Sequence, residues 1–348
     1  MRRTFFTSLT VLTSVLWLMI GSTTGMAQTR QIGFHCASKT EGQQLMDSRT
    51  EYYASLSQID LDWRIRKTNA TLEEFKEYAK SQVEDFTQDE QDFLKRVVDY
   101  VEKRLSEIGC RLPFPTDITI VKTTMNEEGG AGGYTNGNVI YLGASELGRF
   151  ARNTSESQNQ RQLLQIQLLQ MGNLLIHEMF HCLTRNNPDF RRSMYNLIGF
   201  TVLDHDINFP SSVKEYIMTN PDVERLDNFI EVTIDGKKRP CELIVRYSKT
   251  WEEVSAAGNK NASFFNHNEC VLIPLDDLYK AYPVNDVEDF WDQVGRNTRY
   301  VFAPEECLAD NFSYAIISYG EENFKFKSPE LIENIIDLLK SKYGNHKR

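Results

Sequence analysis

The feature that most constrains the fold is the pentapeptide HEMFH at residues 177–181, inside the most strongly helical segment of this 348-residue chain, residues 159–185. Apolar residues recur through that segment at helical spacing, and Asn186-Asn187-Pro188 is expected to end it. Residues four apart on a helix lie on one face, so His177 and His181 are predicted to point at one spot. The chain must therefore fold around a long helix that presents two imidazoles together.

Two imidazoles placed in this way can bind one zinc ion, each with a nitrogen about 2.0–2.1 Å from the metal. Glu178 is rotated away from the two ligands, which lets it reach a water molecule instead of the metal. Zinc lowers the pKa of such a water toward about 7, and Glu178 is then predicted to accept its proton as a general base. A glutamate here has no role at a closed structural zinc site, so its presence favours catalysis. The alternative is a helix with two unrelated histidines.

A zinc hydrolase also needs a third protein ligand and an open fourth position. Thr184 and Asn187 stand where the continuation H-E-x-x-H-x-x-G-x-x-H would place its glycine and third histidine, so that ligand must come from elsewhere. Glu306 is favoured, because Asp310 lies four residues later and can accept a hydrogen bond from a ligating histidine. Three other residues remain alternatives as the third ligand: Glu305, His205 and His267.

In these residues the chain resembles the gluzincin group of zinc metallopeptidases, which includes the thermolysin-like enzymes. That group combines H-E-x-x-H with a downstream helix that bears Glu and, four residues later, Asp, often after a small residue. Glu306, Ala309 and Asp310 match this pattern, and the similarity covers residues 118–185 and 303–320. The chain departs from thermolysin-like enzymes in the long spacing between the second histidine and this glutamate, which stands 125 positions later.

The resemblance implies the roles of the site residues. It implies that the metal is Zn²⁺, that Glu178 is the general base and that a strand within residues 131–142 binds substrate by backbone pairing. The implied metal ligands are His177, His181 and Glu306. Asp310 is the implied hydrogen-bonding partner of a ligating histidine. Candidates to stabilise the oxyanion of the reaction are His205, His267, Tyr134 and Tyr195.

The resemblance and the remaining patterns together predict an α+β, zincin-like fold, with a short, mostly antiparallel sheet beside the active-site helix and a helical second half. Hairpin turns are indicated at Asn136-Gly137 and Asp235-Gly236, and helix starts at Thr71 and Thr87, each followed three residues later by Glu. Residues 28–50 are expected to be irregular. The predicted helices are 71–110 in two pieces, 189–203, 284–297, 303–319 and 328–342, and the predicted strands are 118–121, 133–142, 229–248 and 270–273.

Residues 1–27 have the layout of a secretory signal peptide, with Arg2-Arg3, an apolar stretch over 5–20 and small residues before Gln28. An uncleaved membrane anchor is the alternative. A secreted, periplasmic or cell-envelope location is therefore expected. The rest of the chain is expected to divide into two parts. Residues 28–85 form an N-terminal helical and irregular segment that could cover the cleft as a pro-segment. Residues 86–348 form a metallopeptidase domain with a β-containing insertion around 205–300.

Charge and cysteine content limit the partners and the covalent links. The formal net charge is −10, whereas phosphate binding needs clustered Lys and Arg, so no nucleic-acid partner is expected. Six cysteines in an exported chain permit disulfides. Position suggests the pairs Cys241–Cys270 and Cys182–Cys307, with buried free thiols as the alternative.

These observations predict an exported zinc metallopeptidase that hydrolyses peptide bonds in a peptide or protein substrate. No stable membrane partner is expected unless residues 1–27 stay as an anchor. Two other functions remain open: a non-catalytic envelope protein with a zinc-binding or vestigial zincin helix, and a zinc hydrolase of a non-peptide amide or ester.

Overall fold

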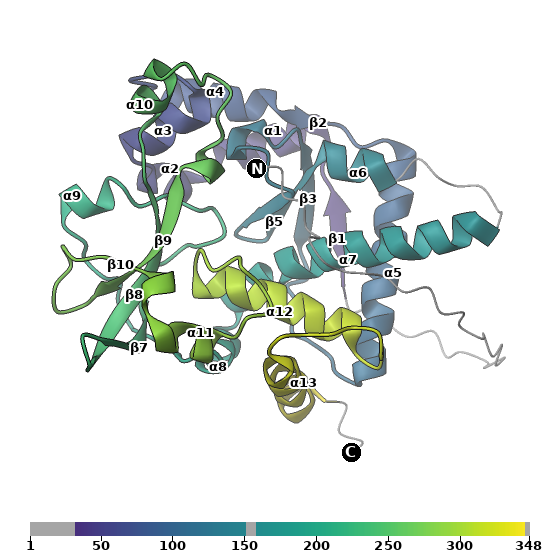
Figure 1. Cartoon of the computed structure of the whole chain (residues 1–348). Coiled ribbons are helices and arrows are strands. Elements are labelled where there is room, and N and C mark those ends of the chain that lie inside the picture. The colour runs from purple at the N-terminus through teal and green to yellow at the C-terminus, as the bar shows by residue number, and fades with distance from the viewer. Residues whose placement is uncertain (1–31, 151–157, 345–348) are drawn as a thin grey trace.

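The computed structural model describes residues 32–150 and 158–344 as an α+β protein with two five-stranded sheets and several long helices (Figure 1). The predicted α+β class is confirmed. The expected signal peptide lies outside the described residues. Within the described ranges, no helix is both long enough and apolar enough to cross a membrane.

The first sheet lies beside α7, the helix that carries HEMFH, and its strand order is β1-β3-β5-β4, with β2 also paired to β3. β1 and β5 run parallel to β3, so the prediction of a mostly antiparallel sheet is wrong here. For β5 the reason is the chain path: β4 runs first along the edge, and a turn at Gly137-Asn138, one residue later than predicted, returns the chain as β5 between β4 and β3. The strands are β1 (Phe34–Cys36), β2 (Val83–Glu84), β3 (Ile118–Thr123), β4 (Gly133–Asn136) and β5 (Val139–Gly143).

Long helices build the other half of the molecule, and α7 and α12 pack side by side across its centre (Figure 1). As predicted, α5 begins with a capping box, in which Thr87 Oγ1 accepts a hydrogen bond from the Glu90 N–H, and it ends at Gly109. The helices of this half are α5 (Gln88–Ile108), α6 (Ala144–Phe150), α7 (Gln158–Asn186), α8 (Pro188–Asn196), α12 (Pro304–Ser318) and α13 (Pro329–Tyr343).

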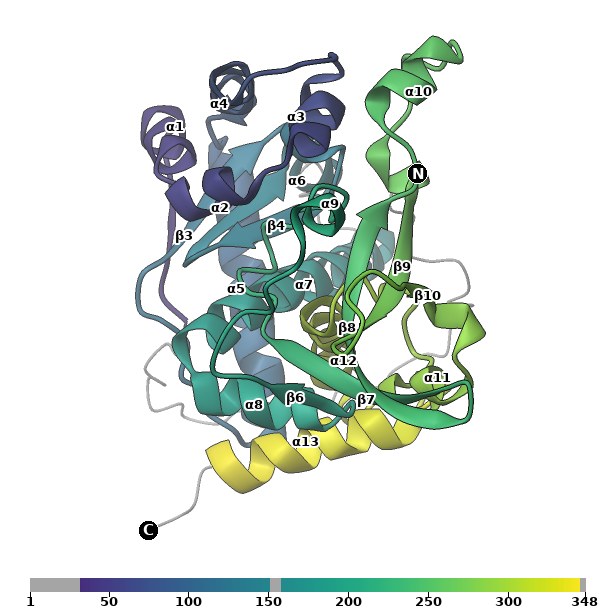
Figure 2. The same ribbon diagram turned by 90° about the vertical axis from the view of Figure 1, so that its left-hand side faces the viewer.

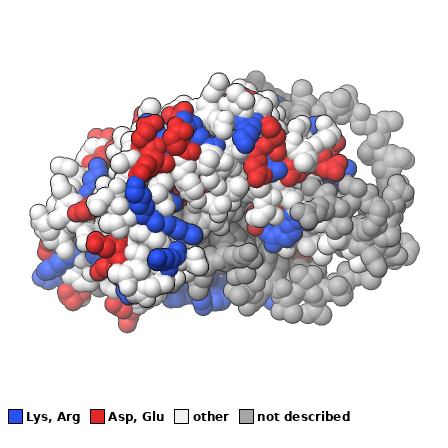
Figure 3. Space-filling view, turned by 90° about the horizontal axis from the view of Figure 1, so that it is seen from above, with Lys and Arg blue, Asp and Glu red and all other residues white. Residues whose placement is uncertain are grey.

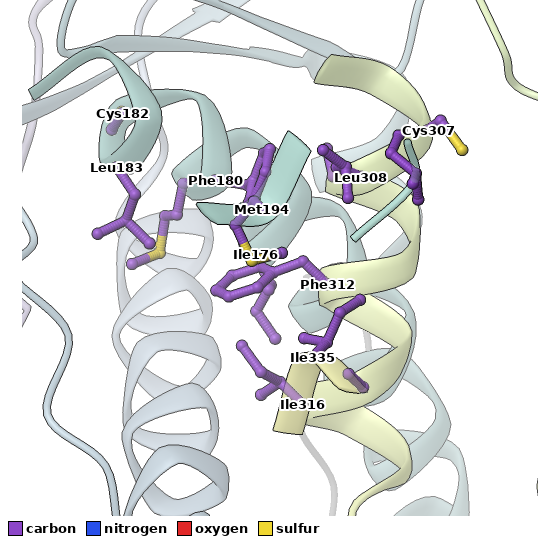
Figure 4. Close-up of a cluster of buried hydrophobic side chains, with 14 of the residues drawn as sticks. Ile176, Phe180, Cys182, Leu183, Met194, Cys307, Leu308, Phe312, Ile316 and Ile335 are labelled. Carbon is purple, nitrogen blue, oxygen red and sulfur yellow. The ribbon is translucent and has the colours of Figure 1, made fainter. Parts of the chain in front are cut away.

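Buried aromatic rings hold α7 against α12. The ring centroid of Phe312 is 5.1 Å from that of Phe180 and 6.1 Å from that of Phe190. Figure 4 shows Phe312 in one apolar cluster with Ile176 and Ile335. These three side chains and those of Phe180 and Phe190 are all buried. This cluster fixes the helix that carries HEMFH relative to the helix that carries the downstream glutamates.

The segment before α5 contains four short helices, so the expectation of irregular structure over residues 28–50 is wrong for the described part, 32–50, and residues 28–31 lie outside the described residues. Ser38 caps α1 by accepting a hydrogen bond from the Glu41 N–H. Gly42 lies so close to the sheet that a Cβ there would be 2.8 Å from Val83. Periodicity gives little warning of a polar helix this short, which buries so few residues. The four helices are α1 (Lys39–Asp47), α2 (Thr50–Ser55), α3 (Gln58–Ile65) and α4 (Leu72–Ser81).

The N-terminal segment shares the first sheet with the chain that follows. Both β1 and β2 are hydrogen-bonded to β3. The division between residues 28–85 and 86–348 stays a prediction.

The second sheet is antiparallel throughout, with strand order β10-β9-β8-β7-β6, and lies across the molecule from the first sheet (Figure 2). The turn at Asp235-Gly236 is confirmed, because both residues have positive φ. The region carries β6 (Phe200–Val202), β7 (Asn228–Ile234), β8 (Lys237–Tyr247), β9 (Asn268–Pro274), β10 (Tyr282–Pro283), α9 (Ser211–Lys214), α10 (Trp251–Ala256) and α11 (Glu288–Val294).

Two predicted helices are shorter than expected. The helix predicted over 189–203 ends at Asn196, because Gly199 has a φ of +80° and the Phe-Thr-Val run after it pairs with β7 as β6. The helix predicted over 284–297 is reduced to a 3-10 turn (Val284–Asp286) followed by α11. The other predicted helices and strands are present within a few residues of their expected ends.

All six cysteines are free thiols, so neither suggested disulfide is present. On the β8–β9 ladder, Cys241 and Cys270 are four residues out of register, roughly 13 Å apart along the strands. The Cys307 thiol faces the Val294 carbonyl oxygen rather than Cys182.

Charged groups of both signs are interspersed on the face shown in Figure 3. That face therefore presents no extended basic surface among the described residues. The expected lack of a nucleic-acid partner stays a prediction.

Candidate metal centre

Helices α7 and α12 bring together the three residues proposed as metal ligands. His177 and His181 lie one turn apart on α7, with ring centroids 5.1 Å apart. Glu306, in the first turn of α12, places its Oε2 atom 3.0 Å from His177 Nε2 and 4.0 Å from His181 Nε2. All three side chains are buried, and their ligand atoms converge closely enough to hold one metal ion.

Each histidine is oriented by a second carboxylate from α12. Asp310 Oδ1 lies 2.9 Å from His177 Nδ1, in the geometry expected from the four-residue spacing to Glu306. Glu305 Oε1 lies 3.2 Å from His181 Nδ1, so this residue supports a histidine instead of competing as the third ligand. A proton on each Nδ1 leaves each Nε2 lone pair available to a metal.

The supporting carboxylates are themselves held by hydroxyl groups. Thr298 Oγ1 donates to Asp310 Oδ2 at 2.6 Å, and Tyr195 OH donates to Glu305 Oε2 at 2.7 Å. Tyr195 thus belongs to the site as a support of Glu305. These hydrogen bonds restrict the rotation of both carboxylates and, through them, the two imidazole rings.

Two residues outside the predicted set hold Glu306. The Asn220 side-chain amide donates to Glu306 Oε1 at 2.6 Å, and Tyr300 OH donates to the same oxygen at 3.0 Å. Oε1 is therefore held by protein donors, while Oε2 faces the histidines. Neither residue sits in a periodic element or a motif, so no pattern in the sequence marks it.

Glu178 lies beside the proposed ligands and against the edge strand β4. Its Oε2 atom accepts a hydrogen bond from Thr135 Oγ1 at 2.9 Å, whereas its Oε1 atom has no hydrogen-bond partner among the described residues. A Cβ on Gly133 would be 2.8 Å from Oε1, so only glycine lets the strand approach this closely. The strand expected at 131–142 is thus in contact with the predicted base.

Asp222 is an additional acidic residue at the centre that sequence reasoning missed. Its Oδ1 atom accepts a hydrogen bond from the Thr135 N–H at 2.6 Å and lies 3.8 Å from His181 Nε2. With Glu178 and His181 it forms a second set of groups that could hold a metal ion. Burial, the largest influence, raises the pKa of the Asp222 carboxyl to about 8.

Three other candidates lie elsewhere. His205 is exposed and pairs with its neighbour Asp204. His267 stacks on the indole of Trp63, with ring centroids 5.4 Å apart. Tyr134 OH donates to Glu127, on the far side of β4 from Glu178. His205, His267 and Tyr134 therefore do not belong to the groups of side chains that could hold the metal ion.

The chemistry of the centre fits a divalent cation. It gathers five buried carboxyl groups, and buried anions are costly unless a cation or several donors compensate them. The His181 Nε2 atom is buried and has no hydrogen-bond partner in the described ranges, and a metal ligand is the role that satisfies it. Burial lowers the pKa of His177, but Asp310 and Glu306 hold it well above its usual value, which reflects the same excess of negative charge. The five carboxyl groups are those of Glu178, Asp222, Glu305, Glu306 and Asp310.

Comparison with protein families, with curated proteins and with solved structures gives no match to this chain. The structure itself shows an α+β protein with a buried group of His, Glu and Asp side chains that could hold a metal ion. The identity of the ion and the reaction are inferred from the arrangement of those side chains.

Proposed function

We propose that this chain is a zinc metallopeptidase of the zincin-like fold, which hydrolyses peptide bonds with Glu178 as the general base. The observation that carries the proposal is the position of Glu178, which adjoins His177 on α7, beside three converging ligand atoms. One of its carboxylate oxygens has no hydrogen-bond partner in the part of the chain that the structure describes. A mixed sheet whose edge strand β4 contacts Glu178 supports the zincin-like assignment.

The roles of the residues follow from their contacts. His177, His181 and Glu306 would hold Zn²⁺, while Asp310 and Glu305 fix the two imidazoles. Zinc would act as a Lewis acid that polarises a carbonyl group and lowers the pKa of water.

Glu178 is the residue that moves the proton. Thr135 anchors its Oε2 atom, so Oε1 is available to take a proton from water and return it to the leaving amine nitrogen. The Tyr300 hydroxyl donates its one proton to Glu306 Oε1, so its role is to hold the third proposed ligand in place.

Substrate is proposed to bind along β4 by backbone pairing, because β4 is the end strand of its sheet and lies against Glu178. The proposal includes export, based on the layout of residues 1–27. A second candidate is a non-catalytic zinc-binding protein, favoured by one observation: Asp222, Glu178 and His181 form a second group that could hold a metal ion, so the centre offers more protein ligands than an open catalytic site uses.

Removal of the metal tests the proposed function. Purified protein loaded with one equivalent of zinc is expected to hydrolyse casein and short peptides in preference to peptidoglycan. A chelator such as 1,10-phenanthroline is expected to abolish the activity, and added zinc to restore it, because the Lewis acid is lost and regained. Hydrolysis that persists without metal, or zinc-loaded protein that cleaves none of the three substrates, would reject the proposal.

A further inference from the structure

One loop lies directly over the proposed metal centre. We use the name covering segment for residues 217–224, which lead from α9 toward β7 between the two sheets (Figure 2). The segment contributes Asn220, which donates to Glu306, and Asp222, which faces His181. It contains no helix or strand, and both backbone and side-chain contacts hold its position.

We infer that Asp222 is a fourth protein ligand of the metal, presented by the covering segment, and that substrate must displace it. The inference rests on the proposed function, since it presupposes the centre formed by His177, His181 and Glu306. It adds a closed state, in which the fourth position is taken by the protein, to the open state that hydrolysis requires.

The distances around His181 support this assignment. Nitrogen and oxygen ligands of one tetrahedral zinc ion are roughly 3.3 Å apart, given bonds of about 2.0–2.1 Å. His181 Nε2 is 3.8 Å from Asp222 Oδ1 and 4.0 Å from Glu306 Oε2, and it has no hydrogen-bond partner among the described residues. The nitrogen therefore points between two carboxylates, at separations within about an ångström of those of shared ligands.

Asp222 is held in this position by its own backbone contacts. The Thr135 N–H donates to the carboxylate oxygen that faces His181, and the Asp222 N–H donates to Asn220 Oδ1 at 3.0 Å. The side chain is only 5% exposed, so a carboxylate here is stable mainly in the company of a cation or of further donors. The same contact takes up a backbone donor of β4 that a substrate strand would need.

The covering segment is clamped from both sides of the cleft. On the N-terminal side, Asp60 accepts a hydrogen bond from the Thr219 N–H at 3.1 Å, and Arg64 donates to the Thr219 carbonyl oxygen at 2.7 Å. On the second sheet, the Met218 N–H donates to the Val245 carbonyl oxygen at 2.9 Å. Asp60 and Arg64 belong to the segment expected as a pro-segment, 28–85. They thus hold the loop that carries Asp222.

The cavity between the covering segment and Gly133 is small, although a cavity of about 460 Å³ borders the segment along Asn136 and Gly137. The cavity between the covering segment and Gly133 is about 30 Å³, and Asp222 and Tyr300 also line it. That is about the share of one liquid water, and far less than a peptide needs. Glu178 Oε1, without a hydrogen bond among the described residues, lies against Gly133, which lines this cavity. A purely structural zinc site has no use for such a carboxylate, so the closed arrangement is best explained as one state of an enzyme.

Metal binding by an Asp222→Ala variant tests the inference. We expect its zinc Kd to rise at least about tenfold, because a ligand is lost. The visible absorption of the cobalt(II)-substituted protein is expected to change in intensity and position, because water replaces a carboxylate. The kcat/KM for a short peptide is expected to rise severalfold, since substrate no longer competes with Asp222.

Glu224→Ala is the matched control, because Glu224 also ties the covering segment to the first sheet, at the turn after β4, through the Gly137 N–H at 3.3 Å. Glu224 lies outside the metal-binding groups. Its zinc Kd and cobalt spectrum are expected to equal those of the wild type. An Asp222→Ala protein with the zinc Kd and cobalt spectrum of the wild type would overturn the inference and leave the metal centre standing. Wild-type protein that binds neither ion would instead reject the proposed function.

A zinc-loaded crystal structure of the wild type decides the matter if Asp222→Ala fails to fold by circular dichroism. An Asp222 oxygen within about 2.0–2.2 Å of the ion is the expected result. An ion bound by His177, His181 and Glu306 with Asp222 turned away would overturn the inference.

Discussion

A Glu178→Gln variant is expected to lose about 10²- to 10⁴-fold in kcat/KM while binding zinc as tightly as the wild type. Glutamine has the shape of glutamate and can keep the hydrogen bond from Thr135 Oγ1, which is 2.9 Å long in the native protein. Its amide cannot accept a proton from water, so the loss falls on the chemical step. The measurement is the rate of hydrolysis of a casein-derived peptide, together with the zinc Kd from a competing chelator.

The exposed residue Glu215 offers a matched control, because Glu215→Gln removes one carboxylate that belongs to neither group of potential metal ligands. That variant is expected to hydrolyse peptide at the wild-type rate. Full activity in zinc-loaded Glu178→Gln would show that another group accepts the proton. A large loss of zinc affinity in the same variant would show that Glu178 belongs to the ligand set.

Replacement of Phe312 by alanine is expected to lower the free energy of unfolding by about 3–5 kcal/mol. The side chain is fully buried between α7 and α12, with its ring 5.1 Å from that of Phe180, and its removal leaves a cavity that the surrounding helices can fill only in part. Because this contact positions His177 and His181 against Glu306, zinc affinity is expected to fall as well. Guanidinium unfolding of the metal-free protein measures the first effect.

The control for this substitution is Tyr279→Ala, which removes an aromatic side chain that is 74% exposed. Its free energy of unfolding is expected to stay within about 0.5 kcal/mol of the wild-type value. A Phe312→Ala protein that unfolds within about 1 kcal/mol of the wild type would mean that the interface between α7 and α12 is held by other contacts.

Elements with a local signal were predictable from the sequence. The capping box at Thr87, the periodicity of residues 159–185, the turn at Asp235-Gly236 and the turn predicted at Asn136-Gly137, which the structure has one residue later, each depend on one stretch of chain. The parallel pairing of β3 with β5 depends on the order in which distant strands meet, so local patterns do not reveal it. The short helix α1 lacks the length that periodicity requires.

In the candidate site, too, contacts that follow from local spacing were predictable, and contacts between distant segments were not. The pairing of Asp310 with His177 follows from the four-residue spacing to Glu306, because both acids lie on one face of α12. The contact of Glu305 with His181 depends on how α12 is rotated against α7, which the sequence leaves open. Asn220, Asp222 and Tyr300 lie outside helices and strands, where neither spacing nor amphipathicity indicates a partner. These three become visible only when the fold brings them to Glu306 and His181.

Zinc binding by the wild type and by Glu306→Ala tests the metal centre most directly, through equilibrium dialysis with elemental analysis of both compartments. The wild type is expected to bind one zinc ion per chain, and the variant to bind it at least about 100-fold more weakly, because a charged ligand is lost. Equal zinc affinity in the two proteins, or no zinc in the wild type, would contradict a centre built from His177, His181 and Glu306.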